Sequence, residues 1–346
     1  MNERRMQVWI TLVGMLALAV LLLFAGSAIA GHPAAAPDPS TGDVATLQSN
    51  SHWFSGWVDI ATDTATTLTH NLGGSPDDYA IEMWFRDTAP GGFGINTVGM
   101  GGMEAGGNFT GAHWQNLTDT TIQVVRLKDD TFADQVWVHI WFTDPPDWDS
   151  GWVSMATDEA RSFTHNVGGN VDDYVVGLWF KDTTPGGIGI NARGYGGLEA
   201  GGQVRGAAWQ KLTGTTVDVL RYPNDTWADQ VRVRIFVPES SDWDSGWVNV
   251  APGTAKPLTH SLGGNLNLYV VRVWQKDVAT DGIGINHRFV GGFEAGGSFL
   301  GSNWQNLTDT TIKVFRLQDD WAADQVRMRI WMIKFKVFLP IVLKGY

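Results

Sequence analysis

The chain contains no cysteine among its 346 residues, and only 17% of its residues are charged. Without cysteine there is no disulfide framework, no thiolate metal site, no cysteine nucleophile and no acylated lipoprotein anchor. The 36 acidic residues outnumber the 24 basic ones, giving a formal charge of −12. A chain this acidic lacks the positive surface that binds nucleic acid or anionic lipid, so we expect no nucleic-acid partner.

Glycine and tryptophan are abundant instead, with 42 and 18 residues, and apolar residues make up 43% of the chain. The apolar fraction is sufficient for large cores. Glycine permits tight turns and close backbone approach, while tryptophan offers a large flat surface with one polar N–H.

Residues 1–30 have the pattern of a secretory signal peptide. Arg4 and Arg5 precede an apolar run over residues 8–24, and Ala28 and Ala30 give a small-x-small cleavage pattern. This pattern predicts a secreted or cell-surface protein with no transmembrane span after cleavage. An uncleaved membrane anchor is the alternative, because the apolar run is close to the lower limit of a span. Residues 31–52, rich in Pro, Ala, Ser and Asp, are predicted to be a linker.

The rest of the chain is one unit written three times with a constant spacing of 95 residues. Trp53, Trp148 and Trp243 open the copies, which we place at 53–147, 148–242 and 243–337. This period exceeds the roughly 20 to 50 residues of solenoid and propeller repeats, so each copy should be a small domain or a sheet sector. Residues 338–346 form a hydrophobic C-terminal tail.

Within each copy the apolar residues alternate. In residues 230–236, Val and Ile alternate with Arg, as a half-buried antiparallel strand requires, and glycine-rich turns separate such runs. No window keeps helical spacing after the signal segment. We therefore predict an all-β fold class: three tandem antiparallel β-sandwich domains of about 95 residues, each with about six or seven short strands.

Each copy has a recurring set of motifs: in the first, Ser55-Gly56-Trp57 opens the unit and the run 68–73 is followed by Pro76 and Tyr79, and closing strands are of the type seen in 231–235. In these motifs, part of each copy resembles the H-type lectin domain family. It implies a six-stranded antiparallel sandwich that assembles as trimers and binds N-acetylgalactosamine-type sugars. The middle of each copy departs from the family, so no sugar-contacting residue is carried over. The resemblance leaves two arrangements open: a pseudo-threefold trimer closed within one chain, or three beads on a string.

The glycine-rich middle of each copy, residues 91–114 in the first, is the predicted ligand-binding segment. β-bulges and tight turns are the alternative explanation for its glycines. Pyranose rings bind by stacking on an aromatic plane while amides and carboxylates contact their hydroxyl groups. The candidate ligand-binding residues are Asn96, Glu104, Trp114, Asn191, Glu199, Trp209, Asn286, Glu294 and Trp304. Residues 97–98, 192–193 and 287–288 differ between copies, as expected if specificity is tuned there or if nothing constrains them.

Other ionisable groups recur in all copies without defining a catalytic or metal site. Asp130 and Asp134 lie in an oxygen-rich loop that offers Ca²⁺ ligands, but a turn cap or an ion pair with Arg126 is favoured over calcium, and no cofactor is predicted. Asp87 and Glu104 would satisfy glycoside hydrolysis if they faced one cleft. We predict no enzyme, because triplication raises the avidity of a weak binding site far more than it raises a catalytic rate.

These patterns together predict a secreted, non-catalytic carbohydrate-binding or adhesion protein with three equivalent low-affinity sites. Its partner would be a glycan or cell-surface polysaccharide. A structural cell-envelope or appendage protein without a ligand is the alternative, and a secreted glycoside hydrolase is less favoured. The C-terminal tail is expected to cover a sheet edge or to pair with the envelope or a second copy of the chain.

Overall fold

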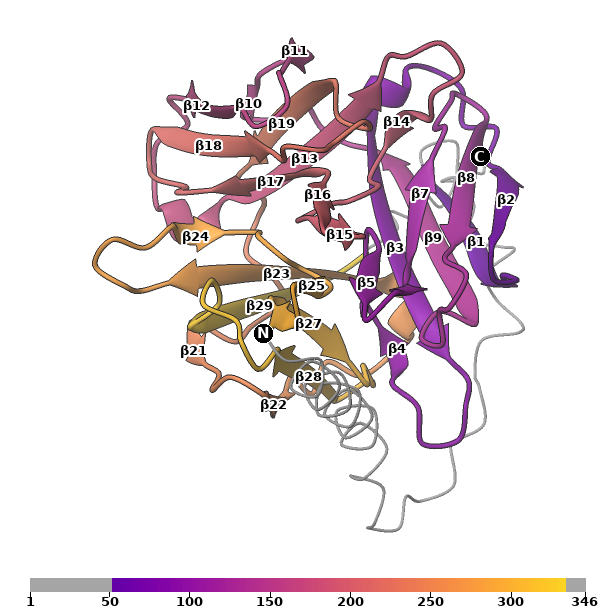
Figure 1. Cartoon of the computed structure of the whole chain (residues 1–346). Coiled ribbons are helices and arrows are strands. Elements are labelled where there is room, and N and C mark those ends of the chain that lie inside the picture. Colours follow the sequence, from indigo (N-terminus) through magenta and orange to yellow (C-terminus); the bar gives the residue numbers. More distant parts are fainter. Residues whose placement is uncertain (1–51, 334–346) are drawn as a thin grey trace, which may run out of the picture.

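The computed structural model describes residues 52–333. The predicted signal segment 1–30, all but the last residue of the predicted linker 31–52, and the tail 338–346 lie outside these residues. Within the described part the chain is all-β, with antiparallel sheets repeated in each copy (Figure 1). No helix in residues 52–333 has the length and apolar content needed to cross a membrane.

The first copy forms nine strands. They are β1 (His52–Asp59), β2 (Thr64–Thr69), β3 (Tyr79–Asp87), β4 (Gly94–Asn96), β5 (Met103–Ala105), β6 (Asn108–Thr110), β7 (Ala112–Gln115), β8 (Thr121–Arg126) and β9 (Gln135–Phe142). A short 3-10 helix, η2 (Pro76–Asp78), precedes β3. The sheet orders are β1-β9-β3-β4 and β2-β8-β7, with β5 and β6 pairing as a separate hairpin.

The second and third copies repeat this plan, with the opening strand split in two. The second copy has β10 (Trp148–Asp149), β11 (Val153–Ser154), β12 (Ala160–Thr164), η3 (Val171–Asp173), β13 (Val175–Asp182), β14 (Gly189–Asn191), β15 (Leu198–Ala200), β16 (Gln203–Arg205), β17 (Ala207–Gln210), β18 (Thr216–Arg221) and β19 (Gln230–Phe236). The third has β20 (Trp243–Asp244), β21 (Val248–Asn249), β22 (Thr254–Thr259), η4 (Leu266–Leu268), β23 (Tyr269–Asp277), β24 (Gly284–Asn286), β25 (Phe293–Ala295), β26 (Ser298–Leu300), β27 (Ser302–Gln305), β28 (Thr311–Arg316) and β29 (Gln325–Met332).

The prediction of six or seven strands per copy is wrong, because the glycine-rich middle is not simply a loop. It forms β4, β5 and β6, each three residues long, separated by glycines with positive φ. Positive φ ends a strand and reverses the chain, so a glycine-dense segment folds into several very short strands.

The alternation seen in the sequence does position the core. In β8, Ile122 and Val124 are buried, while Gln123 points away between them. The apolar residues of β8 join those of β3, β7 and β9 in one cluster, so the two larger sheets of the first copy share a core in a sandwich-like manner. The other copies have equivalent clusters.

The three copies form the closed arrangement and are not beads on a string: within the described residues, each copy contacts the other two. The backbone N–H of Leu117 donates to Ile190 O at 3.2 Å, that of Leu212 to Ile285 O at 3.1 Å, and that of Leu307 to Ile95 O at 3.2 Å. These three bonds join the first copy to the second, the second to the third, and the third to the first. The copies therefore form a ring about a pseudo-threefold axis (Figure 1).

Two of the three interfaces contain an Arg–Asp ion pair at equivalent positions. Between the first and second copies, Arg232 contacts Asp77 at 3.4 Å, and Trp152 Nε1 donates to the same carboxylate at 3.0 Å. Between the second and third copies, Arg327 and Trp247 make the equivalent contacts with Asp172.

The interface between the third and first copies, which we call the seam, has an aromatic residue in place of that arginine. At the equivalent positions Trp137 replaces the arginine and Asn267 replaces the aspartate. Phe54 and Trp137 of the first copy belong to the core cluster of the third. Phe54 also stacks on His139, with ring centroids 4.1 Å apart. No connector joins the two copies that meet at the seam. They are held together by burial of apolar surface, by backbone hydrogen bonds such as that from Leu307, and by the ion pair between Glu82 and Arg272.

Glycine permits the close approach of the copies near the axis. Gly101 has φ +82°, and a Cβ there would lie 2.8 Å from the backbone N of Tyr195 in the next copy. The equivalent glycines, Gly196 and Gly291, face the backbones of Val290 and Met100 in the same way. The nearest atoms that each Cβ would meet belong to the backbone of the next copy, which cannot move aside cheaply.

We predict that Gly101→Ala destabilises the fold by about 3 kcal/mol or more, because it combines left-handed strain with a backbone clash between copies. Gly91→Ala is the matched control: φ is +78° and nothing lies within 4 Å of the added Cβ. The control should lose only about 1 to 2 kcal/mol. Urea unfolding measures both, and equal losses would show that the copies do not approach this closely.

Candidate functional site

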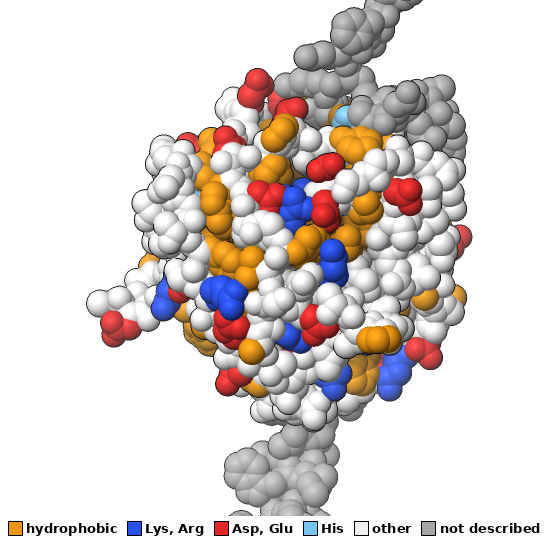
Figure 2. Space-filling model, turned by 90° about the horizontal axis from the view of Figure 1, so that it is seen from above, with side chains coloured by type: hydrophobic (Ala, Val, Ile, Leu, Met, Phe, Trp, Pro, Cys, Tyr) orange, Lys and Arg blue, Asp and Glu red, His pale blue; other side chains and the backbone are white. Residues whose placement is uncertain are grey.

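A cavity of about 860 Å³ is lined by residues from all three copies. Its walls come mainly from β3, β13 and β23, one strand from each copy, and residues of the two connectors also contribute. The volume lies within the range usual for small-molecule sites, about 300 to 1,000 Å³. Figure 2 shows one face of the molecule, on which hydrophobic side chains gather in a hollow with acidic and basic side chains among them.

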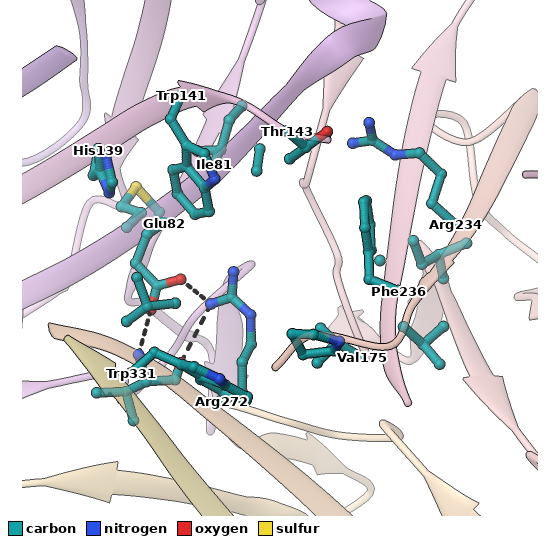
Figure 3. Close-up of a pocket in the computed structure, with 18 of the residues that line it drawn as sticks. Ile81, Glu82, His139, Trp141, Thr143, Val175, Arg234, Phe236, Arg272 and Trp331 are labelled. Atoms are coloured by element: carbon teal, nitrogen blue, oxygen red, sulfur yellow. Dashed lines mark hydrogen bonds and ion pairs between the residues drawn. The ribbon is translucent and has the colours of Figure 1, made fainter. Parts of the chain in front are cut away.

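Aromatic residues at equivalent positions in the three copies line much of the cavity. Trp141, Phe236 and Trp331 occupy one such position, and all three are half-buried (Figure 3). Two further sets are buried in the wall: Trp84, Trp179 and Trp274, and Trp114, Trp209 and Trp304.

The three tryptophans named as ligand-binding residues are therefore not surface platforms. Trp114, Trp209 and Trp304 are only 6%, 1% and 2% exposed. Trp114 packs edge-to-face against Trp179 of the next copy, with ring centroids 5.9 Å apart. What remains available to a ligand is the part of each ring that faces the cavity.

The asparagines of the predicted site hold the backbone of their own copies. The amide of Asn96 donates to the carbonyls of Gly94 and Phe132 and accepts from the N–H of Val98. Asn191 and Asn286 are equally buried and make equivalent bonds. The sequence placed Asn, Glu and Trp in one ligand-facing loop, but in the structure these side chains have three different environments.

The glutamates of the predicted site converge on each other. Glu104, Glu199 and Glu294 are buried, and their ligand oxygens lie within 4.8 Å of one another. They come from β5, β15 and β25, whose hairpins meet at the centre of the ring (Figure 1). Carboxylates at this spacing have the chemistry to hold a hard divalent cation. None of the three lines the cavity.

Backbone amides already engage these carboxylates. Glu104 accepts from Gly107 in its own hairpin and from Gly201 of the next copy at 3.0 Å. Glu294 likewise accepts from Gly297 and, at 3.3 Å, from Gly106. Burial, together with the proximity of Glu104, raises the pKa of Glu199. A shared proton relieves the repulsion between two such carboxylates.

The polar groups of the cavity differ between the copies, unlike its aromatic frame. Glu82 in the first copy corresponds to Gly177 in the second and to Arg272 in the third. Glu82 and Arg272 form an ion pair across the wall (Figure 3). Glu82 also accepts from Trp84 Nε1 at 2.7 Å and from the N–H of Val271 at 3.3 Å, so its oxygens are well occupied.

Arg234 provides a second guanidinium in the cavity wall. It donates to the carbonyls of Asp77 and Tyr79, at 2.9 and 2.8 Å, and lies 4.2 Å from the Trp179 ring centroid. Burial lowers its pKa to about 10, which still leaves it charged at neutral pH.

Sequence reasoning missed Glu82, Arg234 and Arg272. For Glu82 and Arg272 the available signal was a strand position whose charge changes sign between copies. The position of Arg234 has His139 and Arg329 in the other copies and gives no such signal, and sequence alone does not show that these strands face one cavity.

The remaining shared charges have structural partners. Arg126 pairs with Asp130 at 2.8 Å and Asp134 at 2.9 Å, the ion pair favoured over calcium. Asp130 also accepts from the N–H of Gly111 at 2.6 Å and from that of Ala133 at 2.8 Å.

Asp87 and Glu104, the pair that glycoside hydrolysis would need, have different surroundings. Asp87 accepts from the N–H groups of Ala89 and Phe93 within the β3–β4 turn, whereas Glu104 belongs to the cluster of three glutamates.

Comparison with known proteins found no matching family model, no matching curated protein and no matching solved structure.

The cluster of three glutamates predicts a specific pH dependence. Because the folded-state pKa of Glu199 is raised above its ordinary value of 4.5, its protonated form favours folding, and that contribution is lost as pH rises from 4.5 through the raised pKa. Glu199→Gln, which is uncharged throughout, should therefore gain stability relative to the natural protein as pH rises. Urea unfolding from pH 4 to 8 measures this.

Glu239→Gln, at an exposed position, controls for the loss of one negative charge. A stability difference between Glu199→Gln and the natural protein that does not vary with pH would contradict the clustering of the carboxylates.

Proposed function

We propose that this is a secreted, non-catalytic binding protein that takes a sugar or the end of a glycan in its central cavity. The observation that supports the proposal best is the cavity itself, framed by aromatic side chains from all three copies and containing few charged groups. Aromatic planes with a small number of fixed polar groups suit the apolar C–H face and the hydroxyl edge of a pyranose ring.

The proposal includes the finer reading of the fold: three sandwich domains of the H-type lectin kind, following a signal segment. It revises the sequence expectation in one respect. Three separate sites would need three equivalent open grooves, whereas the cavity is shared and its polar groups differ from copy to copy. We therefore expect one ligand for each chain in this cavity.

A structural envelope protein without a ligand is the second candidate, favoured by the burial of Trp114, Trp209 and Trp304. The two candidates differ in a direct way. A scaffold needs the aromatic residues only for packing, while a binding protein also needs those that are half-exposed in the cavity.

A glycan array with the folded protein should give binding to a defined set of sugars. Trp141→Ala and Trp331→Ala should each weaken that binding roughly tenfold, because each removes a stacking surface. Trp321→Ala is the control, since Trp321 is 43% exposed and lies outside the cavity lining. Absence of binding on a broad array, or equal losses for all three variants, would favour the scaffold.

A further inference from the structure

One corner of the cavity differs from its two counterparts. It lies where the second and third copies meet and contains Tyr195, Trp209, His287 and Arg272. The backbone N–H of His287 donates to Trp209 O at 3.0 Å, and the rings of Tyr195 and His287 are edge-to-face, with centroids 4.7 Å apart. We call these four residues the polar corner.

The polar corner has unused hydrogen-bonding capacity. Within the described residues, His287 Nδ1 is buried without a hydrogen-bond partner, and the buried Trp209 Nε1 interacts only with the side chain of Tyr195. Trp209 is itself 1% exposed, so its N–H cannot rely on bulk water. The Tyr195 hydroxyl, which lines the cavity, can accept from the Trp209 N–H and donate its own proton to a ligand.

The unused capacity consists mainly of donors. Arg272 uses Nη1 for its bonds to Glu82 and to the carbonyl of Val271, and its guanidinium has further N–H groups. Burial lowers the pKa of Arg272 to about 10, so it stays charged at neutral pH. Burial also lowers the pKa of His287 to about 3, so its imidazole is neutral and contributes one N–H. The matching ligand group must accept several hydrogen bonds.

The other two interfaces lack this arrangement. At the position of His287 the first copy has Thr97 and the second has Ala192, and at the position of Tyr195 the other copies have Met100 and Val290. The aromatic wall is shared by the copies, while the donor groups gather at one interface. A ligand held here would have one acceptor-rich end and would bind in a single orientation.

Building on the proposed function, we infer that the polar corner binds the carboxylate of an acidic sugar, a uronic acid residue, whose ring lies against the aromatic wall. A carboxylate offers two oxygens to the Arg272 and Tyr195 donors, and charge-assisted bonds of this type are about twice as strong as neutral ones. The exposed acidic groups at the connectors, Asp144, Asp147 and Glu239, are largely screened at physiological salt.

Calorimetric titration of the full chain with a methyl glucuronide and a methyl glucoside tests this inference. We expect the glucuronide to bind at least about tenfold more tightly, since the two differ only in the carboxylate. Trp209→Phe removes the N–H that holds the Tyr195 hydroxyl, and Tyr195→Phe removes that hydroxyl, while both keep an aromatic side chain. Each should weaken glucuronide binding about fivefold to tenfold and leave glucoside binding nearly unchanged.

Trp114→Phe is the matched control, because it makes the same change at the equivalent position outside the polar corner. Equal affinity for the two sugars, or an equal loss in Trp114→Phe, would overturn the carboxylate assignment and leave the proposed function standing. Failure of both sugars, together with an empty glycan array, would overturn the proposed function as well. Thermal unfolding of each variant establishes that it is folded before titration.

Discussion

The fold depends on the approach of three backbones to a common axis. Gly101, Gly196 and Gly291 bring each copy against its neighbour at distances that leave no room for a Cβ. The contacts between copies require that approach, and so do the shared cavity and the meeting of the three glutamate hairpins. The glycine-rich segment therefore serves mainly to pack the copies together. It affects ligand binding only indirectly, because the shared cavity depends on that packing.

A chain that contains three copies can carry different residues at equivalent positions, which a homotrimer cannot. In a homotrimer every residue on the axis appears three times, so a glutamate there always faces two others. Here that holds for Glu104, Glu199 and Glu294, but the position of Glu82 carries glycine and arginine in the other copies. Because each copy can change separately, opposite charges can pair across the cavity. A symmetric frame can then hold an asymmetric set of polar groups.

Much of the architecture could be read from the sequence. The spacing of 95 residues gave the three units, and alternation in segments such as 121–126 gave strands with the correct buried face. The pairing of Arg126 with Asp130 was also among the expectations, because the two residues are four apart in one turn. These features could be predicted because they depend on a regular spacing or on residues that are close together in the sequence.

Contacts between copies could not be predicted from the sequence in the same way. Repetition showed that Glu104, Glu199 and Glu294 occupy equivalent positions, but convergence depends on how the copies are placed about the axis. Trp114 was expected to contact a ligand, and its burial arises from packing against the neighbouring copy. Strand number was underestimated because glycine-dense sequence resembles loop, even where it forms three-residue strands.

The aromatic seam bears on whether one chain closes on itself or joins others. Each copy offers one face to the next, which is a head-to-tail contact, and such contacts generate filaments when they do not close. Since Phe54 and Trp137 fit the third copy and differ from the Asp–Arg groups elsewhere, the chain carries a distinct pair of ends that match each other. Within one chain those ends are held at high effective concentration, so closure outcompetes association between molecules until the protein is very concentrated. The same seam would join chains end to end if a ring opened, which makes ring closure a safeguard against polymerisation.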